Sequence, residues 1–163
     1  MKILLLGANG QLGRTFLDQG GLAARGELAA ACRDGVLTTG GLGKIADLSD
    51  PVSLPAVLDR LRPDVIVNAA AYTAVDRAEQ EEALATRVNG EAVGTLGRWA
   101  AAHGALVIHY STDYVFDGHQ SQPYAVDAPT GPLGAYGRSK LAGEGALRDS
   151  GADHFIFRTA WVY

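Results

Sequence analysis

The chain has 163 residues, of which 47% are hydrophobic and 20% are charged, and its formal net charge is −4. These values are typical of one globular domain and argue against a disordered chain or a nucleic-acid surface. No apolar run approaches the roughly 20 residues that span a bilayer, no signal peptide is recognisable, and the lone Cys32 excludes an internal disulfide, so we expect a cytoplasmic protein without a membrane partner.

The first element is a near-continuous apolar run, Lys2–Leu6, which predicts a strand that is buried on both faces. Glycines follow at intervals of three residues, Gly7, Gly10 and Gly13, and then a segment that favours a helix. A strand that turns directly into a helix presents backbone N–H groups and the positive end of the helix dipole to an anion. The pattern therefore predicts a cradle for a dinucleotide, the alternative being an ordinary glycine-rich turn.

The segment Glu27–Cys32 predicts a second strand, and Arg33 and Asp34 follow it directly. Arg33 at this position favours NADPH, because an arginine pairs with a 2′-phosphate. Asp34 leaves NADH open, since an acidic residue near this strand end binds ribose hydroxyls in NAD sites. The alternative for Arg33 is a solvated surface side chain.

A helix is predicted after the loop that ends at Gly43, with Asp50 as its N-cap and Pro51 at its first position. A short buried strand, residues 65–67, follows it. The segment Asn68–Thr73 then lies at the carboxyl end of that strand, where open α/β sheets bind ligands. Its alanines would let a cofactor approach, although they are equally suited to plain packing.

Residues 81–103 predict one long helix that Gly104 ends. Within it, Trp99 is expected in the core, and Asn89 is either an exposed amide or a brace for the neighbouring strand. His103 and His109 have no partner at metal-ligand spacing, so both are expected to be structural and no metal site is predicted.

The last segments are a strand over residues 105–110, a long loop over residues 117–135, a helix over residues 136–148 and a strand over residues 154–158. A loop of that length in a small domain is usually functional or mobile. Alternation of strands and helices predicts an α/β fold, a Rossmann-type doubly wound parallel sheet with helices on both faces.

Acid–base chemistry is indicated by Tyr136 and Lys140, which lie four residues apart and so share one face of the predicted helix. A nearby ammonium is expected to lower the pKa of the tyrosine, which is ordinarily about 10. Ser111 and Thr112, at the end of the preceding strand, supply hydroxyls that can hold a substrate carbonyl.

These motifs together resemble the extended short-chain dehydrogenase/reductase family and, within it, the family of dTDP-4-dehydrorhamnose reductases. The resemblance spans the whole chain in the family's order. The segments that carry it are 7–13, 62–79, 109–118 (His-Tyr-Ser-Thr-Asp-Tyr-Val-Phe-Asp-Gly), 136–144 and 157–163 (Phe-Arg-Thr-Ala-Trp-Val-Tyr).

The resemblance implies a hydride transfer from NADPH, with NADH possible, to the C4 keto group of a nucleotide sugar, dTDP-4-dehydro-L-rhamnose. It implies a catalytic triad of Thr112, Tyr136 and Lys140, with Asp113, Trp161 and Thr112 contacting the sugar. It also implies a cofactor site. The residues expected there are Gly7, Gly10, Gln11, Leu12, Gly13, Arg33, Asp47, Leu48, Ala71, Tyr72, Thr73, Tyr110, Tyr136 and Lys140.

Departures from the family pattern limit what the resemblance implies. Related dehydratases carry a glutamate where this chain has Tyr114, which favours plain reduction over an epimerase or dehydratase reaction. Some members bind Mg²⁺ through a glutamate where this chain has Thr15, so no metal is carried over. Residues 1–163 are expected to form one NAD(P)-binding Rossmann domain without the family's C-terminal substrate portion.

Two further expectations follow from the resemblance. The shortness of the chain leaves open a non-catalytic regulatory subunit on the same fold, and this polypeptide is possibly inactive by itself. A nucleotide sugar is the expected partner, with a homodimer as a possible assembly.

Overall fold

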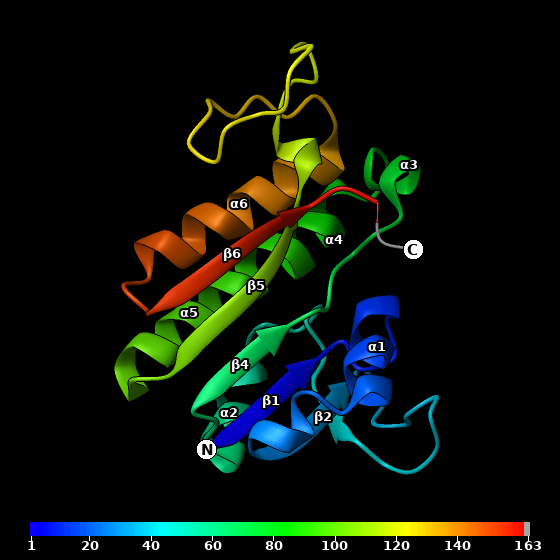
Figure 1. The fold of residues 1–163 in the computed structure, drawn as a ribbon, viewed down its shortest axis with the longest axis vertical. Helices are drawn as coiled ribbons and strands as arrows, with labels where there is room; N and C mark the ends of the chain where they lie inside the picture. The colour runs from blue at the N-terminus through cyan, green and yellow to red at the C-terminus, as the bar shows by residue number, and fades with distance from the viewer. Residues whose placement is uncertain (162–163) are drawn as a thin grey trace.

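The computed structural model describes residues 1–161 and shows six parallel strands in the order β3-β2-β1-β4-β5-β6 (Figure 1). This is the Rossmann order, so the predicted fold class is confirmed. The strands are β1 (Lys2–Leu6), β2 (Glu27–Cys32), β3 (Lys44–Ile45), β4 (Val65–Asn68), β5 (Leu106–Thr112) and β6 (His154–Thr159). The α-helices are α1 (Gln11–Gln19), α2 (Leu54–Leu61), α3 (Val75–Ala78), α4 (Glu82–Thr86), α5 (Ala92–His103) and α6 (Ala135–Asp149).

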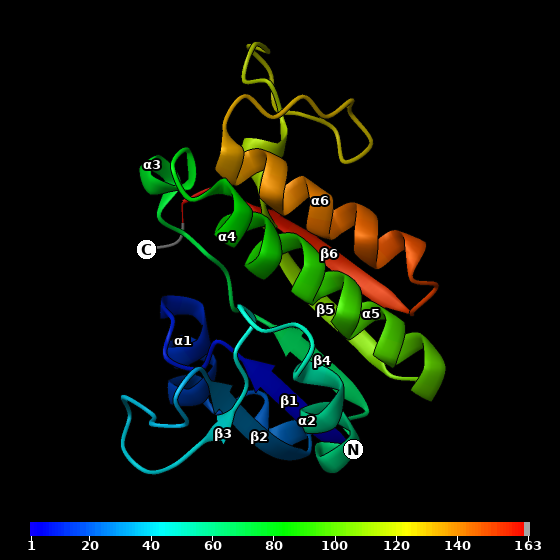
Figure 2. The same ribbon diagram turned by 180° about the vertical axis from the view of Figure 1, so that it is seen from behind.

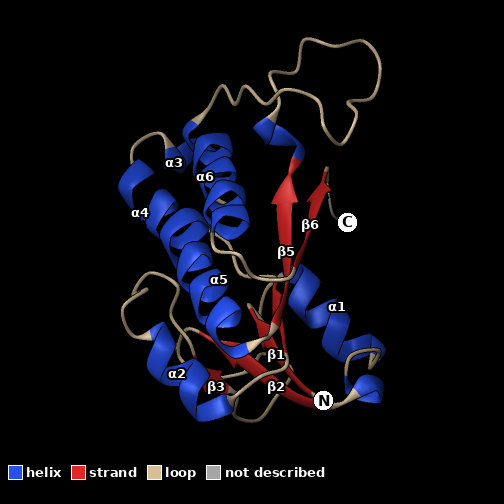
Figure 3. Cartoon of the chain, turned by 90° about the vertical axis from the view of Figure 1, so that its left-hand side faces the viewer, coloured by secondary structure: helices blue, strands red, loops and turns tan. Residues whose placement is uncertain are grey.

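Helices cover both faces of the sheet, but unequally. Helices α2, α4, α5 and α6 lie on one face, as the view from behind shows, and α1 lies on the other (Figures 2 and 3). None of the helices in residues 1–161 is both long enough and apolar enough to cross a membrane.

The central strand β1 shows why the first apolar run is nearly continuous. Leu4 and Leu6 belong to the core under α2, α5 and α6, whereas Ile3 and Leu5 belong to the core that α1 covers. All four side chains are buried because successive residues of a strand point to opposite faces and both faces are covered.

The predicted start of α2 is wrong, because the helix begins at Leu54 and Asp50 does not cap it. The Asp50 carbonyl oxygen instead accepts hydrogen bonds from the Ser53 N–H at 3.2 Å and from the Ser53 hydroxyl at 2.9 Å. These bonds close a turn over residues 51–53 that takes the place of the expected first helical turn.

The predicted helix over residues 81–103 is present but not uniform. A π-helical turn, η2 (Arg87–Glu91), joins α4 to α5, and Gly104 ends α5 with a φ of +67°. Helix α3 and the two-residue strand β3 were not predicted, since both are too short to show a hydrophobic period.

The carboxyl ends of all six strands lie along one edge of the sheet because every strand pair is parallel. Strand order reverses between β1 and β4, which is where such sheets bind ligands. A 3₁₀ turn, η3 (Asp113–Val115), follows β5, and the long loop from Phe116 to Gly134 then leads into α6 (Figure 1).

Candidate active site

A cavity of about 290 Å³ lies at this edge of the sheet. It brings together segments that are far apart in the sequence: the start of α1, the loop after β4, the ends of β5 and β6, and the first turns of α6. Its lining residues are Gln11, Ala69, Ala70, Ala71, Thr73, Val75, Tyr110, Ser111, Thr112, Asp113, Tyr114, Tyr136, Lys140, Thr159, Ala160 and Trp161.

Tyr136 and Lys140 both line this cavity from successive turns of α6, as their spacing predicted. The Lys140 side chain is only 1% exposed, and its Nζ donates a hydrogen bond to the Tyr110 carbonyl oxygen at 2.6 Å. Helix α6 is held at its start by Glu79, whose Oε1 accepts a hydrogen bond from the Ala135 N–H at 2.7 Å. The phenol and the amine therefore line one cavity from a helix that is fixed at its first residue.

The electrostatics of the pair differ from the expectation. Burial lowers the pKa of Lys140 to about 8, although the charge of Glu144 acts in the opposite direction. Burial raises the pKa of the Tyr136 phenol, and a hydrogen bond with Thr112 offsets only part of that increase. The predicted lowering of the Tyr136 pKa is thus wrong for this structure, because the phenol loses water on burial and the Lys140 ammonium points to the Tyr110 carbonyl.

The residues expected at the sugar lie on the same cavity. Thr112 ends β5, is 5% exposed, and accepts a hydrogen bond from the Tyr114 N–H at 3.2 Å through its hydroxyl oxygen. Its hydroxyl also lies 3.2 Å from Asp113 Oδ1. Asp113 and Trp161 are exposed at the cavity, where a large ligand can reach them.

The glycine-rich turn fits a diphosphate group. A Cβ at Gly13 would lie 2.1 Å from the Gly7 carbonyl oxygen, so glycine alone permits the backbone to pack this closely. Gly10, the residue before α1, provides no side-chain cap, and the first turn of α1 has no acidic residue. The positive end of the helix is therefore presented to an anion without a competing carboxylate.

The structure decides between the two roles that the sequence left open for Asn89, an exposed amide or a brace. It is 1% exposed within η2, accepts a hydrogen bond from the Tyr72 N–H at 2.8 Å, and donates to the Tyr72 carbonyl at 3.0 Å and to Ser139 Oγ at 2.9 Å. Asn89 is therefore a buried brace between the loop after β4 and α6. The Tyr72 hydroxyl donates to Glu81 Oε2 at 2.5 Å, so this side chain points away from the cavity that its neighbours line.

The remaining residues that were expected at the cofactor lie outside the cavity, at the carboxyl ends of β1, β2 and β3. Arg33 is exposed after β2. Asp47 accepts hydrogen bonds from both the N–H and the hydroxyl of Ser49, and the Leu48 side chain is buried in the core. Gly7 and Gly10 lie in the turn, and Leu12 and Gly13 lie in the first turn of α1 beside Gln11, which does line the cavity.

Sequence reasoning missed two lining residues at the end of β6, Thr159 and Ala160. Thr112 and Thr159 are register partners, and Thr159 Oγ1 donates to the Ser111 carbonyl at 3.3 Å. The signal was present, because two adjacent parallel strands that end in polar residues place them at the same edge of a sheet.

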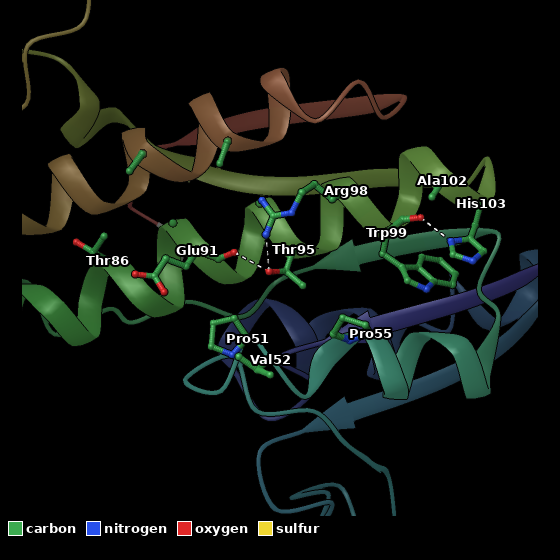
Figure 4. Close-up of a pocket in the computed structure, with 14 residues that line it drawn as sticks. Pro51, Val52, Pro55, Thr86, Glu91, Thr95, Arg98, Trp99, Ala102 and His103 are labelled. Carbon is green, nitrogen blue, oxygen red and sulfur yellow. Dashed lines mark hydrogen bonds between the residues drawn. The ribbon is translucent and has the colours of Figure 1, made fainter.

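A larger groove of about 910 Å³ lies elsewhere, between α5 and the segment that leads into α2 (Figure 4). Trp99 and His103 stack in it with ring centroids 4.1 Å apart, and Trp99 Nε1 donates to Asp59 Oδ1 at 2.9 Å. Trp99 belongs to the hydrophobic core, as predicted, and the exposed His103 stacks on it. Thr112, Tyr136 and Lys140 line the smaller cavity and not this groove, so the smaller cavity is the candidate active site.

Comparison with known proteins identifies the family. A family model described as the RmlD substrate binding domain matches residues 1–163. The chain belongs to this family.

Named relatives of this member of the RmlD substrate binding domain family include the dTDP-4-dehydrorhamnose reductases of Burkholderia thailandensis and Salmonella typhimurium, which are 48% and 46% identical to it. The matches cover 100% of the chain but 51% and 52% of those proteins, so the chain spans about half the length of these curated relatives. The resemblance inferred from the motifs is confirmed.

Solved structures agree. A dTDP-4-dehydrorhamnose reductase from Clostridium acetobutylicum matches with a TM-score of 0.89 and 34% identity over 100% of this chain and 54% of that one. The reductase from Bacillus anthracis, solved in complex with NADP, matches with a TM-score of 0.87 and 30% identity over 99% of this chain and 54% of that one. The conserved architecture therefore includes the whole sheet of this member of the RmlD substrate binding domain family.

Proposed function

We propose that residues 1–163 form the NAD(P)-binding Rossmann domain of a reductase that converts dTDP-4-dehydro-L-rhamnose to dTDP-L-rhamnose. One observation carries the proposal: Thr112, Tyr136 and Lys140 line a single cavity beside the glycine turn of α1. A regulatory subunit has no need for this combination, and Tyr114 stands where a dehydratase needs a second acid.

The residues that would hold the dinucleotide surround the switch point of the sheet. The turn with Gly7, Gly10 and Gly13 would bind the diphosphate, and Gln11, Leu12, Ala71, Thr73, Tyr110 and the backbone of Tyr72 would line the path to the nicotinamide. Asp47 and Leu48 would lie at the adenosine end. NADPH, when bound, supplies the hydride for the C4 carbon.

The chain's own residues handle the proton and the orientation of the substrate. Tyr136 donates its phenolic proton to the C4 oxygen of the sugar, and its raised pKa keeps it protonated, as a general acid must be. Thr112 donates a hydrogen bond to the same oxygen. Lys140 binds the ribose hydroxyls of the dinucleotide and stabilises the phenolate that remains, while Asp113 and Trp161 contact the deoxysugar.

The proposal is tested with a protein of the relatives' full length that contains this chain. Mixing dTDP-4-dehydro-L-rhamnose with NADPH is expected to give dTDP-L-rhamnose and one NADP⁺ per product, measured by absorbance and by NMR of the sugar. NADPH binding by the 163-residue chain, measured by calorimetry, tests the domain alone. Absence of binding would refute the assignment of the domain.

We assign the choice of NADPH over NADH to Arg33, and the Bacillus anthracis relative was solved in complex with NADP. Arg33→Ala is expected to weaken NADPH binding by at least about tenfold, because a charge-assisted pair with phosphate contributes about 1.5–3 kcal/mol, and to leave NADH binding unchanged. Calorimetric titration with both dinucleotides measures this preference.

Arg60→Ala is the matched control, since Arg60 is exposed on α2, away from the cavity. Equal loss for NADPH and NADH in the Arg33 variant would show that this arginine does not read the 2′-phosphate.

The proposed setting is the cytoplasm, where the dinucleotide and nucleotide sugars are available and where a free, buried Cys32 stays reduced. The homodimer stays a prediction.

A further inference from the structure

Glu144 is a fully buried carboxylate on α6 that does not line the cavity. Arg158 of β6 donates to both of its oxygens, from Nε at 2.9 Å and from a terminal nitrogen at 2.7 Å, and Arg148 donates at 2.8 Å. Bidentate pairing of this kind fixes the orientation of both groups. Burial raises the pKa of Glu144, but interactions with Arg158, Ser111 and Arg148 outweigh it together and hold the pKa below its usual value.

Arg158 is itself held from other directions. Its other terminal nitrogen donates to the Val126 carbonyl at 3.1 Å, and its guanidinium lies 4.9 Å from the centroid of the Phe116 ring. Arg158 therefore contacts the long loop between η3 and α6 as well as Glu144, and these contacts hold the guanidinium in the position from which it orients the carboxylate.

Tyr136, Lys140 and Glu144 follow one another at intervals of four residues, so they lie on one face of α6. Lys140 and Glu144 are both buried, and charges in the interior are screened far less than charges at the surface. Glu144 is not in hydrogen-bond contact with Lys140, but its charge favours the protonated amine.

The other groups that face Lys140 do not supply a negative charge. On β5, His109 is buried and its pKa lies well below the usual value, and Tyr110 offers only its carbonyl oxygen. On α6 itself, Tyr136 is a phenol whose pKa is raised by burial, and Arg148 of α6 and Arg158 of β6 are cations that both pair with Glu144. Among residues 1–161, Glu144 is the carboxylate that acts on Lys140.

We propose that Glu144 is a positioning residue that acts through Lys140: its buried charge, fixed by Arg158, keeps the Lys140 amine protonated at the base of the cavity. The role rests on the proposed function, because it matters for catalysis only if Lys140 binds the dinucleotide. The ionisation of Lys140 can nevertheless be measured without any ligand.

The test is the titration of Lys140 in the full chain with isotope-labelled lysine side chains, followed by NMR. In the unaltered chain the amine is expected to titrate near pH 8. Glu144→Gln keeps the shape but removes the charge, so the titration is expected to move to lower pH. A decrease of one unit would reduce the protonated fraction at pH 8 from about one-half to about one-tenth and weaken NADPH binding there about fivefold.

Arg148→Met provides a variant with the opposite expected sign. Arg148 is half-exposed, so its loss is tolerable for folding, and removing its charge leaves the field of Glu144 less neutralised. The Lys140 titration should then move to higher pH, and an unchanged titration would contradict an action of this buried charge cluster on Lys140. If Glu144→Gln does not fold, the Arg148 variant carries the test.

Asp149→Asn is the matched control, because it makes the same chemical change at an exposed position of α6. Identical Lys140 titrations in the unaltered chain and in both test variants would overturn the proposal. Failure of the unaltered chain to bind NADPH would instead refute the proposed function, and the titration result would stand independently of it.

Discussion

Replacing Tyr136 by phenylalanine is expected to lower turnover of the keto sugar by about 10²- to 10⁴-fold, the usual contribution of a positioned proton donor. The change removes one oxygen atom and leaves the ring in its contact with Tyr114, where the two ring centroids are 5.6 Å apart. NADPH binding should remain within about twofold, because the glycine turn and Lys140 are untouched. Steady-state kinetics and calorimetry on the whole protein measure the two effects separately.

Tyr124→Phe serves as the control for this variant. Its hydroxyl donates to Asp117 in the long loop, outside the cavity, so the same chemical change there should leave turnover nearly unaltered. Unchanged turnover in the Tyr136 variant would remove this phenol from the mechanism.

Gly13→Ala is expected to weaken NADPH binding by at least about tenfold and to destabilise the fold. The new Cβ would lie 2.1 Å from the Gly7 carbonyl oxygen and 2.9 Å from the Ala8 Cα, both backbone atoms that cannot move aside as a flexible side chain can. Overpacking of this kind costs about 1–3 kcal/mol, and each kcal/mol lowers the Tm of a domain of this size by about 2–4 °C. Thermal unfolding and calorimetric titration provide the two measurements.

Gly145→Ala makes the same change within α6, where an added Cβ would meet no atom within 4 Å. Because alanine is the better helix former, this control should stabilise the protein by about 0.5–1 kcal/mol and leave NADPH binding intact. If the Gly13 variant bound NADPH as tightly as the control, the close packing of the turn would be irrelevant to the ligand.

Much of the sheet could be predicted because burial on two faces leaves a clear sequence pattern, as in Lys2–Leu6. The π-helical turn at Arg87–Glu91 could not, because tertiary hydrogen bonds from Asn89 to Tyr72 and Ser139 accompany it rather than a local propensity. The start of α2 was wrong for a related reason: an aspartate before a proline satisfies the rule for a helix cap, yet a turn closed by Ser53 competes with it.

The candidate site shows the same division. The spacing of Tyr136 and Lys140 fixes their common helix face, so their meeting in one cavity was predictable. The direction in which the pKa of Tyr136 shifts was not predictable. It depends on how far the fold excludes water from the phenol and on which acceptor the Lys140 amine hydrogen-bonds. The Tyr72 hydroxyl is directed toward Glu81, nine residues along the chain, and no sequence motif indicates that hydrogen bond.

The packing of α6 against η2 has a consequence for attempts to transplant this chemistry. A Cβ at Gly143 would lie 2.0 Å from the Asn89 carbonyl oxygen, so the helix that carries the phenol and the amine rests directly on another backbone. If the tyrosine and lysine were grafted onto a helix with a larger residue at the position of Gly143, its Cβ would prevent the helix from packing this closely against its neighbour. The recipient scaffold needs the small residue as much as the reactive ones.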